Sequence, residues 1–113
     1  MHEMSLAVSM IEQLEEIIKK EGAEKIESIH LEIGALSGVE KDAFEFVFPF
    51  AAEGTVASEA ILTFDKVSLE FECRKCGFVH ITESPEMMCP KCSSVDLNVL
   101  KGEDFKIKTM EVI

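Results

Sequence analysis

The sequence of 113 residues contains no tryptophan and no tyrosine, and it is poor in basic residues. Its 11 Lys and Arg residues stand against 22 Asp and Glu residues, which gives a formal net charge of -11. Nucleic-acid interfaces depend on basic residues and often on stacking aromatics, and anionic membrane surfaces repel an acidic chain. We therefore expect neither nucleic acid nor a membrane surface as a partner.

Long apolar runs are also missing. No run reaches the roughly 18 residues that a membrane-spanning helix needs. The N-terminal segment has an acid at position 3 and no basic region followed by an apolar stretch, so it does not look like a secretory signal. We expect a cytoplasmic protein, and in that compartment the four cysteines are better explained as metal ligands than as disulfides.

Motifs of catalysis are absent as well. The sequence contains no HExxH, no glycine loop of the kind that cradles phosphate, and no Ser-His-Asp or Cys-His set with local support. His30 alternates out of an apolar strand pattern, where a surface or packing role is commoner than a role as a base. We therefore expect a protein that is not an enzyme.

The residues that are present predict a small globular protein with both helices and strands. Apolar residues recur every three or four positions over 4–21, which predicts an amphipathic helix with Gly22 as its stop. Alternation of apolar and polar residues predicts a strand over 29–33. A second helical pattern covers 43–51, and we expect Pro49 to kink that helix or to make its last turn irregular.

The second half of the chain changes character twice. An extended run begins near Ala60, and its apolar positions change phase near Lys66, which indicates a bulge or a boundary. Between Cys73 and Leu100 large apolar residues become scarce, as in a metal-held knuckle with little core of its own. Alternation returns after Gly102, and this last strand could rejoin the first sheet.

The four cysteines form two CxxC pairs with twelve residues between them, Cys73 with Cys76 and Cys89 with Cys92. Two residues between thiols let both sulfurs face one ion, and two such pairs complete the tetrahedron that suits zinc. Four thiolates leave no open position for water or substrate, so the predicted zinc site is structural. Disulfides or free thiols are the alternative. His80 is either a competing ligand or a polar residue of the knuckle.

The chain starts with Met1-His2-Glu3. His2 is too large for removal of the initiator methionine, so we expect Met1 to keep its free amine. That amine, the amide and imidazole nitrogens of His2 and the amide of Glu3 would form consecutive chelate rings in a plane, which suits Ni(II) or Cu(II) better than zinc. Because binding displaces protons, it should weaken as the pH falls. The alternative is a terminus with no metal role.

These two features, in this order, resemble the HypA family of nickel-insertion proteins in NiFe-hydrogenase maturation. The resemblance also includes Gly34-Ala35-Leu36-Ser37-Gly38-Val39 after the first predicted strand and the closing Met110-Glu111-Val112. It covers essentially the whole chain. Many zinc ribbons share the cysteine pairs alone, whereas their combination with the terminal Met-His-Glu is far more specific.

The resemblance implies an α+β fold in two parts. A small mixed sheet with two helices would form a nickel-binding domain from residues 1–66 and 103–113. A zinc-ribbon-like domain, held by four cysteine ligands, would be inserted between them over residues 67–102.

The resemblance also implies sites and partners. Ni(II) binding by the family's N-terminal segment carries over to Met1, His2 and Glu3, and Glu40 occupies the place where some members have an acidic residue near nickel. The implied partners are the GTPase HypB and the hydrogenase large subunit, with urease accessory proteins in some bacteria. The leading hypothesis is a nickel metallochaperone. The alternative is a zinc-ribbon adaptor that binds a protein partner and needs no free terminus.

Overall fold

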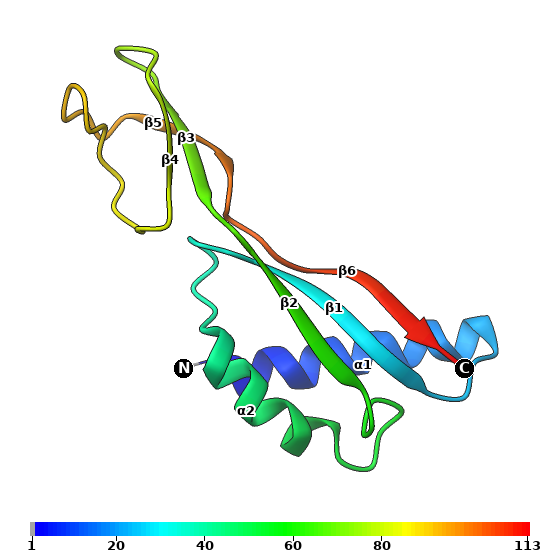
Figure 1. Ribbon diagram of the computed structural model, residues 1–113. Coiled ribbons are helices and arrows are strands. Elements are labelled where there is room, and N and C mark those ends of the chain that lie inside the picture. Colours follow the sequence, from blue (N-terminus) through cyan, green and yellow to red (C-terminus); the bar gives the residue numbers. More distant parts are fainter. Residues whose placement is uncertain (1) are drawn as a thin grey trace. The chain divides into compact units, whose positions relative to one another are not determined.

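The structure is a computed structural model, and it describes residues 2–113. Over these residues the chain forms two helices and six strands (Figure 1). No helix in this part of the chain is long and apolar enough to cross a membrane. The elements are α1 (Glu3–Glu21), β1 (Ile26–Gly34), α2 (Lys41–Ala52), β2 (Ile61–Val67), β3 (Leu69–Cys73), β4 (Val79–Thr82), β5 (Leu97–Lys101) and β6 (Phe105–Val112).

The first sheet has the strand order β2-β1-β6. Backbone hydrogen bonds join Lys25 to Ile113 at one end of β1 and Gly34 to Asp104 at the other, so β1 and β6 run antiparallel. Figure 1 shows β1 and β2 running in the same direction, with α2 in the connection between them. The sheet is therefore mixed, and the last strand rejoins it, as the sequence allowed.

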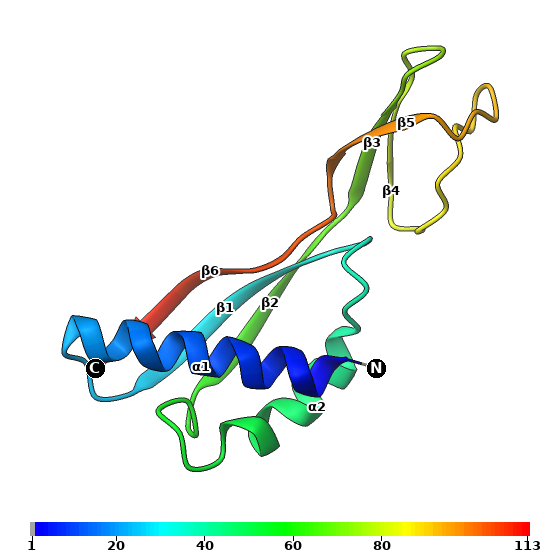
Figure 2. The same cartoon turned by 180° about the vertical axis from the view of Figure 1, so that it is seen from behind.

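One compact unit contains both helices. It comprises the chain up to Leu31, Val39–Phe64 and Ile107–Ile113. Its first helix confirms the predicted amphipathic pattern and ends at Gly22, whose left-handed conformation allows its N–H to close the last turn. Figure 2 shows α1 lying along β1. The buried apolar side chains of this unit are Ala7, Met10, Ile11, Leu14, Ile18, Ile26, Ile29, Leu31, Phe44, Phe48, Ala52 and Ala57.

The second helix is also confirmed, and it continues past its proline. Pro49 lies inside α2, three residues before the helix ends at Ala52. A proline removes one intrahelical hydrogen bond, and so close to the end the loss affects only the last turn. Phe44 is the centre of the packing, because its ring lies 5.9 Å from the Phe48 ring and 6.4 Å from the Phe64 ring, measured between centroids.

The other compact unit comprises Glu32–Gly38 and Asp65–Lys106 and contains the second sheet. This sheet has the order β4-β3-β5, and both outer strands run antiparallel to β3. The phase change predicted near Lys66 corresponds to the break between β2 and β3. Strands β4 and β5 were not indicated by the sequence, because they are short and β4 turns its apolar side chains, Val79 and Ile81, to solvent.

The core of the second unit is small. Its buried apolar residues are Ile33, Leu69, Phe71, Cys73 and Cys89, and two of these five are cysteines. This agrees with the prediction of a segment with little core of its own. Small folds of this kind need an additional constraint, such as a metal, to be stable.

Gly102, which directly follows β5, packs closely against the backbone of β3 and the residue before it. Its φ angle is +99°, and an added Cβ would lie 2.7 Å from the Ser68 carbonyl oxygen and 2.8 Å from the Leu69 Cα. We expect Gly102→Ala to lower the free energy of unfolding by at least about 2 kcal/mol, because strain and overpacking act together. Urea unfolding measures the loss.

Gly54→Ala is the matched control for this substitution. Gly54 also has a positive φ, +76°, but an added Cβ would meet nothing within 4 Å. It should therefore cost only the conformational strain, about 1 kcal/mol. Equal losses in the two variants would contradict the close packing at Gly102.

Candidate metal centre

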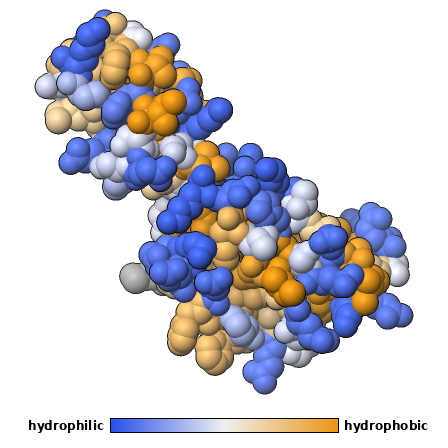
Figure 3. All heavy atoms as spheres, viewed as in Figure 1, coloured by the Kyte–Doolittle hydropathy of each residue, from blue (hydrophilic) through white to orange (hydrophobic). Residues whose placement is uncertain are grey.

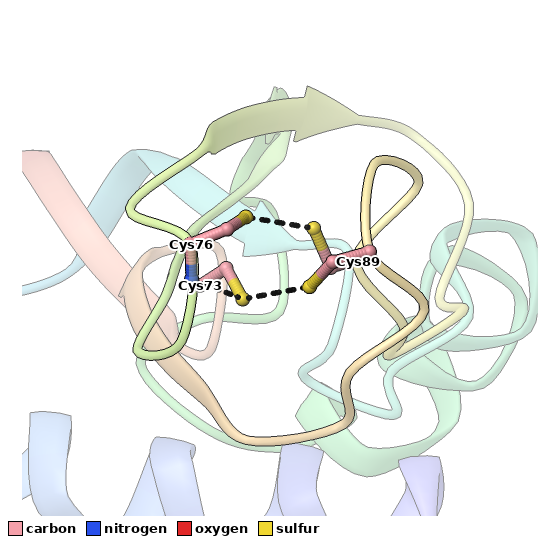
Figure 4. Close-up of side chains that lie close together, drawn as sticks. Cys73, Cys76 and Cys89 are labelled. Carbon is pink, nitrogen blue, oxygen red and sulfur yellow. Dashed lines mark hydrogen bonds between the residues drawn. The ribbon is translucent and has the colours of Figure 1, made fainter.

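The two CxxC pairs converge on one point. The Sγ atoms of Cys73 and Cys92 lie 3.5 Å apart, and those of Cys76 and Cys89 lie 3.6 Å apart. All four sulfurs lie within 4.8 Å of one another. Figure 4 shows Cys73 and Cys76 facing Cys89 across the gap. Zinc–sulfur bonds of about 2.3 Å in a tetrahedron place sulfurs about 3.8 Å apart, so the cluster has the dimensions of a four-thiolate zinc site.

The turns that carry the cysteines repeat each other. The N–H of Gly77 donates to the Cys73 carbonyl over 2.9 Å, and the N–H of Ser93 donates to the Cys89 carbonyl over 2.8 Å. The φ angles of Gly77 and Ser93 are +77° and +64°, so the residue after each pair turns the chain through the left-handed region. The equal spacing of the two motifs therefore produces two matching turns, which present their sulfurs to each other.

Hydrogen bonds within the cluster give the thiols different pKa values. The N–H of Cys76 has the largest influence on Cys73 and, against the effect of burial, lowers the pKa of its thiol to about 6. The N–H of Ser94 lowers the pKa of Cys92, but hydrogen bonds to the other sulfurs, together with burial, outweigh it and raise that pKa to about 12. Without a metal the cluster thus shares its protons unevenly, and a metal would have to displace those that remain.

His80 does not belong to the cluster. Among the described residues, the group of His, Cys, Asp and Glu side chains that could hold a metal consists of the four cysteines. The His80 ring instead lies 5.5 Å from the Phe71 ring and 6.0 Å from the Phe78 ring, measured between centroids. Of the two interpretations of His80, the structure thus supports a residue of the knuckle that is not a ligand, and its ring packs against two phenylalanine rings.

The sulfur distances predict how the cluster oxidises. After metal removal and mild oxidation by hydrogen peroxide, which accepts two electrons per disulfide, we expect Cys73 to bond to Cys92 and Cys76 to Cys89. The sulfurs of these two pairs lie 3.5 Å and 3.6 Å apart, and this pairing is one of the three that four cysteines allow. Peptide mapping under non-reducing conditions identifies the pairing. Disulfides within each CxxC pair would contradict this geometry.

The predicted nickel ligands lie at the start of α1, and the structure describes two of them. Met1 lies outside the described residues. His2 directly precedes α1, and its carbonyl accepts the first helical hydrogen bond, from the N–H of Leu6, over 3.0 Å. The His2 residue is exposed, and its side chain makes no capping hydrogen bond. The imidazole is therefore accessible to an ion from solution.

Glu3 has a role that the sequence did not indicate. Its side chain is buried, and its carboxylate accepts a hydrogen bond of 3.3 Å from the backbone N–H of Glu40. The positive charge of the amino terminus and the hydrogen bond from this N–H lower the pKa of Glu3 to about 2, so the side chain is ionised at neutral pH. Acids are common in first turns of helices, so nothing in the pattern distinguished this one.

Glu40 caps the second helix. Its carboxylate accepts hydrogen bonds of 3.2 Å from the N–H groups of both Asp42 and Ala43. Because its own N–H donates to Glu3, Glu40 joins the first turn of α1 to the first turn of α2. The structure thus brings together two of the predicted nickel-site residues, through the backbone of one and the carboxylate of the other.

Comparison with known proteins decides the family. Residues 1–112 match the family described as "Hydrogenase/urease nickel incorporation, metallochaperone, hypA". The chain belongs to the HypA family. A hydrogenase maturation factor HypA from Chlorobium limicola is 37% identical over 112 residues, which cover 99% of this chain and 97% of that protein. The HypA of Rhizobium leguminosarum bv. viciae is 37% identical over the full length of both chains.

Solved structures of HypA proteins share the fold. The solution structure of the nickel metallochaperone HypA from Helicobacter pylori superposes with a TM-score of 0.70 at 32% identity, covering 100% of this chain and 98% of that one. A second HypA solution structure gives 0.71 at 31% identity, covering 100% and 97%. The α+β fold is therefore that of HypA. As a member of this family, the chain is a nickel-incorporation metallochaperone that works in hydrogenase maturation, and it is not an enzyme.

Proposed function

We propose that this HypA protein binds one Ni(II) ion at its N-terminus and passes it to the hydrogenase large subunit together with the GTPase HypB. The observation that carries the proposal is the accessible His2 side chain directly before a helix that Glu3 anchors to α2. Urease accessory proteins are a second proposed partner, because the family description names urease beside hydrogenase.

The proposed ligands are nitrogen atoms of three consecutive residues. They are the amine of Met1, the amide and imidazole of His2, and the amide of Glu3. N–H groups in the first turn of a helix have no intrahelical acceptor, so deprotonating them for a metal breaks no helical hydrogen bond. Glu40 is the proposed additional oxygen ligand, because its hydrogen bond to Glu3 holds it beside the start of α1. Nickel release would be favoured at low pH, where these nitrogens regain protons.

For the cysteine cluster we propose a structural Zn(II) ion held by Cys73, Cys76, Cys89 and Cys92. The distances between the sulfurs and the small core around them support this assignment. In this proposal residues 1–66 and 103–113 serve nickel, and residues 67–102 serve zinc.

We expect His2→Ala to abolish nickel binding, since it removes the imidazole ligand from the chelate. One residue added before Met1 should have the same effect, because it converts the terminal amine into an amide. A nickel titration of purified protein without a tag measures both, and elemental analysis should still find one zinc per chain.

His30→Ala is the control for the nickel titration. His30 lies on β1, with its Nδ1 atom 2.6 Å from the Thr63 hydroxyl, and belongs to no proposed nickel site. This variant should bind nickel as the unchanged protein does. Unaltered nickel affinity in His2→Ala, or in the extended chain, would refute the terminal chelate.

Delivery is tested separately. Nickel-loaded protein should transfer the ion to the hydrogenase large subunit when HypB and GTP are present, whereas the extended chain should transfer none. If the extended chain supports transfer equally well, the N-terminus is not the site from which nickel is delivered.

A further inference from the structure

The outward face of α2 carries a pair of exposed aromatic side chains. Phe46 is 71% exposed and Phe50 is 62% exposed, although Phe44 and Phe48 of the same helix are buried. The two exposed rings contact each other, with their centroids 5.7 Å apart. Pro49, between them in the sequence, is also exposed. We call Phe46, Pro49 and Phe50 the aromatic stripe.

Acidic residues stand at both ends of the aromatic stripe. Asp42 lies four residues before Phe46, on the same face of the helix, and Glu53 is the residue that directly follows the helix, three residues after Phe50. Both acids are exposed. The face is therefore an apolar strip of about one turn, with an acidic residue about one turn away on each side.

The basic residue of α2 offsets only part of the negative charge of this face, because it is shared between two acids. Lys41 is half-buried, and its Nζ lies 5.2 Å from the centre of the Phe64 ring, 3.8 Å from Glu45 Oε1 and 4.0 Å from Asp42 Oδ1, whereas Glu53 has no basic neighbour within α2. Lys41 is thus engaged with β2 and with its own helix. In Figure 3 an apolar patch lies over part of α2, with hydrophilic residues beside it. Exposed aromatic side chains that gather in this way are typical of protein interfaces, where they bury a large area with little loss of side-chain entropy.

We propose that the aromatic stripe, with Asp42 and Glu53 at its ends, docks a basic amphipathic helix of a partner protein. The charges select this occupant. A second copy of the chain would bring acid against acid on molecules that each carry a net charge of -11, and anionic lipid would be repelled in the same way. A helix with an apolar strip flanked by Lys or Arg would cover both rings and pair with both acids.

The proposal is tested with a synthetic helical peptide of about 18 residues, which has leucine on one face and lysine elsewhere. Fluorescence anisotropy should show that it binds the full-length protein. Phe46→Ser combined with Phe50→Ser should weaken binding by about tenfold or more. Asp42→Asn combined with Glu53→Gln should weaken binding less and make it less sensitive to salt. Chemical shifts should change along α2 in NMR spectra of the unchanged protein.

Two controls separate docking from general stickiness. Ile17→Ser combined with Val95→Ser removes two exposed apolar side chains elsewhere and should leave the affinity unchanged. A peptide with glutamate in place of lysine, or with serine in place of leucine, should not bind. Thermal melts should show that every variant is folded.

Three results would overturn the proposal. They are unchanged peptide affinity in the double phenylalanine variant, equal binding of the peptide that lacks leucine, and a dimer of the unchanged protein in analytical ultracentrifugation that the phenylalanine substitutions abolish. The last result would identify a second copy as the occupant of the stripe.

Discussion

Loss of the metal from the cysteine cluster, or the substitution Cys89→Ala, is expected to unfold the second unit while the first stays folded. The second unit buries only a few large apolar side chains, chiefly Leu69 and Phe71, beside its cysteines. In small peptides a structural zinc ion contributes about 10–16 kcal/mol to folding, more than such a core supplies. Amide hydrogen exchange should show protection lost in β3, β4 and β5 and retained in α1 and α2.

The control for Cys89→Ala is Met88→Ala, at the neighbouring exposed position. It removes an apolar side chain from the same loop without touching the cluster, so protection in β3 and β5 should be unchanged. If Cys89→Ala retained that protection after zinc had been chelated, the cluster would not be what holds the second sheet together.

The first unit could be predicted well from the sequence because its signals are local and agree with each other. In α1 the apolar spacing, the basic last turn and the glycine stop all indicate one helix, which was predicted over 4–21 and is found at Glu3–Glu21. The final strand was recognisable by alternation, but alternation does not determine a strand's neighbour. Its pairing with β1 depends on hydrogen bonds between residues far apart in the sequence, such as Lys25 with Ile113.

The second unit was harder to predict from the sequence, because the cysteine cluster holds it together more than a regular apolar pattern does. The CxxC spacing indicated which four residues would meet, but not that Cys73 would contact Cys92 and Cys76 would contact Cys89. Strand β4 places His80 on its buried side, opposite Phe71, and turns its apolar residues Val79 and Ile81 to solvent. This is the reverse of the usual arrangement, in which the apolar residues of a strand are buried. The role of Glu3 could not be predicted from the sequence either, because its hydrogen-bond partner Glu40 lies 37 residues away.

The phenylalanines of α2 show how far the spacing of apolar residues can predict secondary structure. Phe44, Phe46, Phe48 and Phe50 alternate with other residues, which by itself is the signature of a strand. The longer helical spacing, which includes Ala43, Val47 and Ala51, correctly indicated a helix. A helix must place alternate residues on different faces, so two of the four rings enter the core and two remain outside.

This division predicts opposite outcomes for neighbouring substitutions. Phe44→Ala is expected to lower the free energy of unfolding by about 3–5 kcal/mol, since it removes a fully buried ring that contacts Phe48 and Phe64. A domain of this size has about 5–15 kcal/mol in total, so the loss would be a large part of it. Phe46→Ala, at an exposed position two residues away, should change it by no more than about 0.5 kcal/mol.

The measurement is urea unfolding at saturating zinc, followed by the helical circular dichroism signal. Both helices belong to the first unit, so this signal reports on the core that contains Phe44. The unfolding midpoint of Phe44→Ala should fall well below that of Phe46→Ala, with similar slopes. Equal midpoints would mean that the Phe44 ring contributes no more to the core than an exposed side chain, and the helix would then have to face the sheet differently.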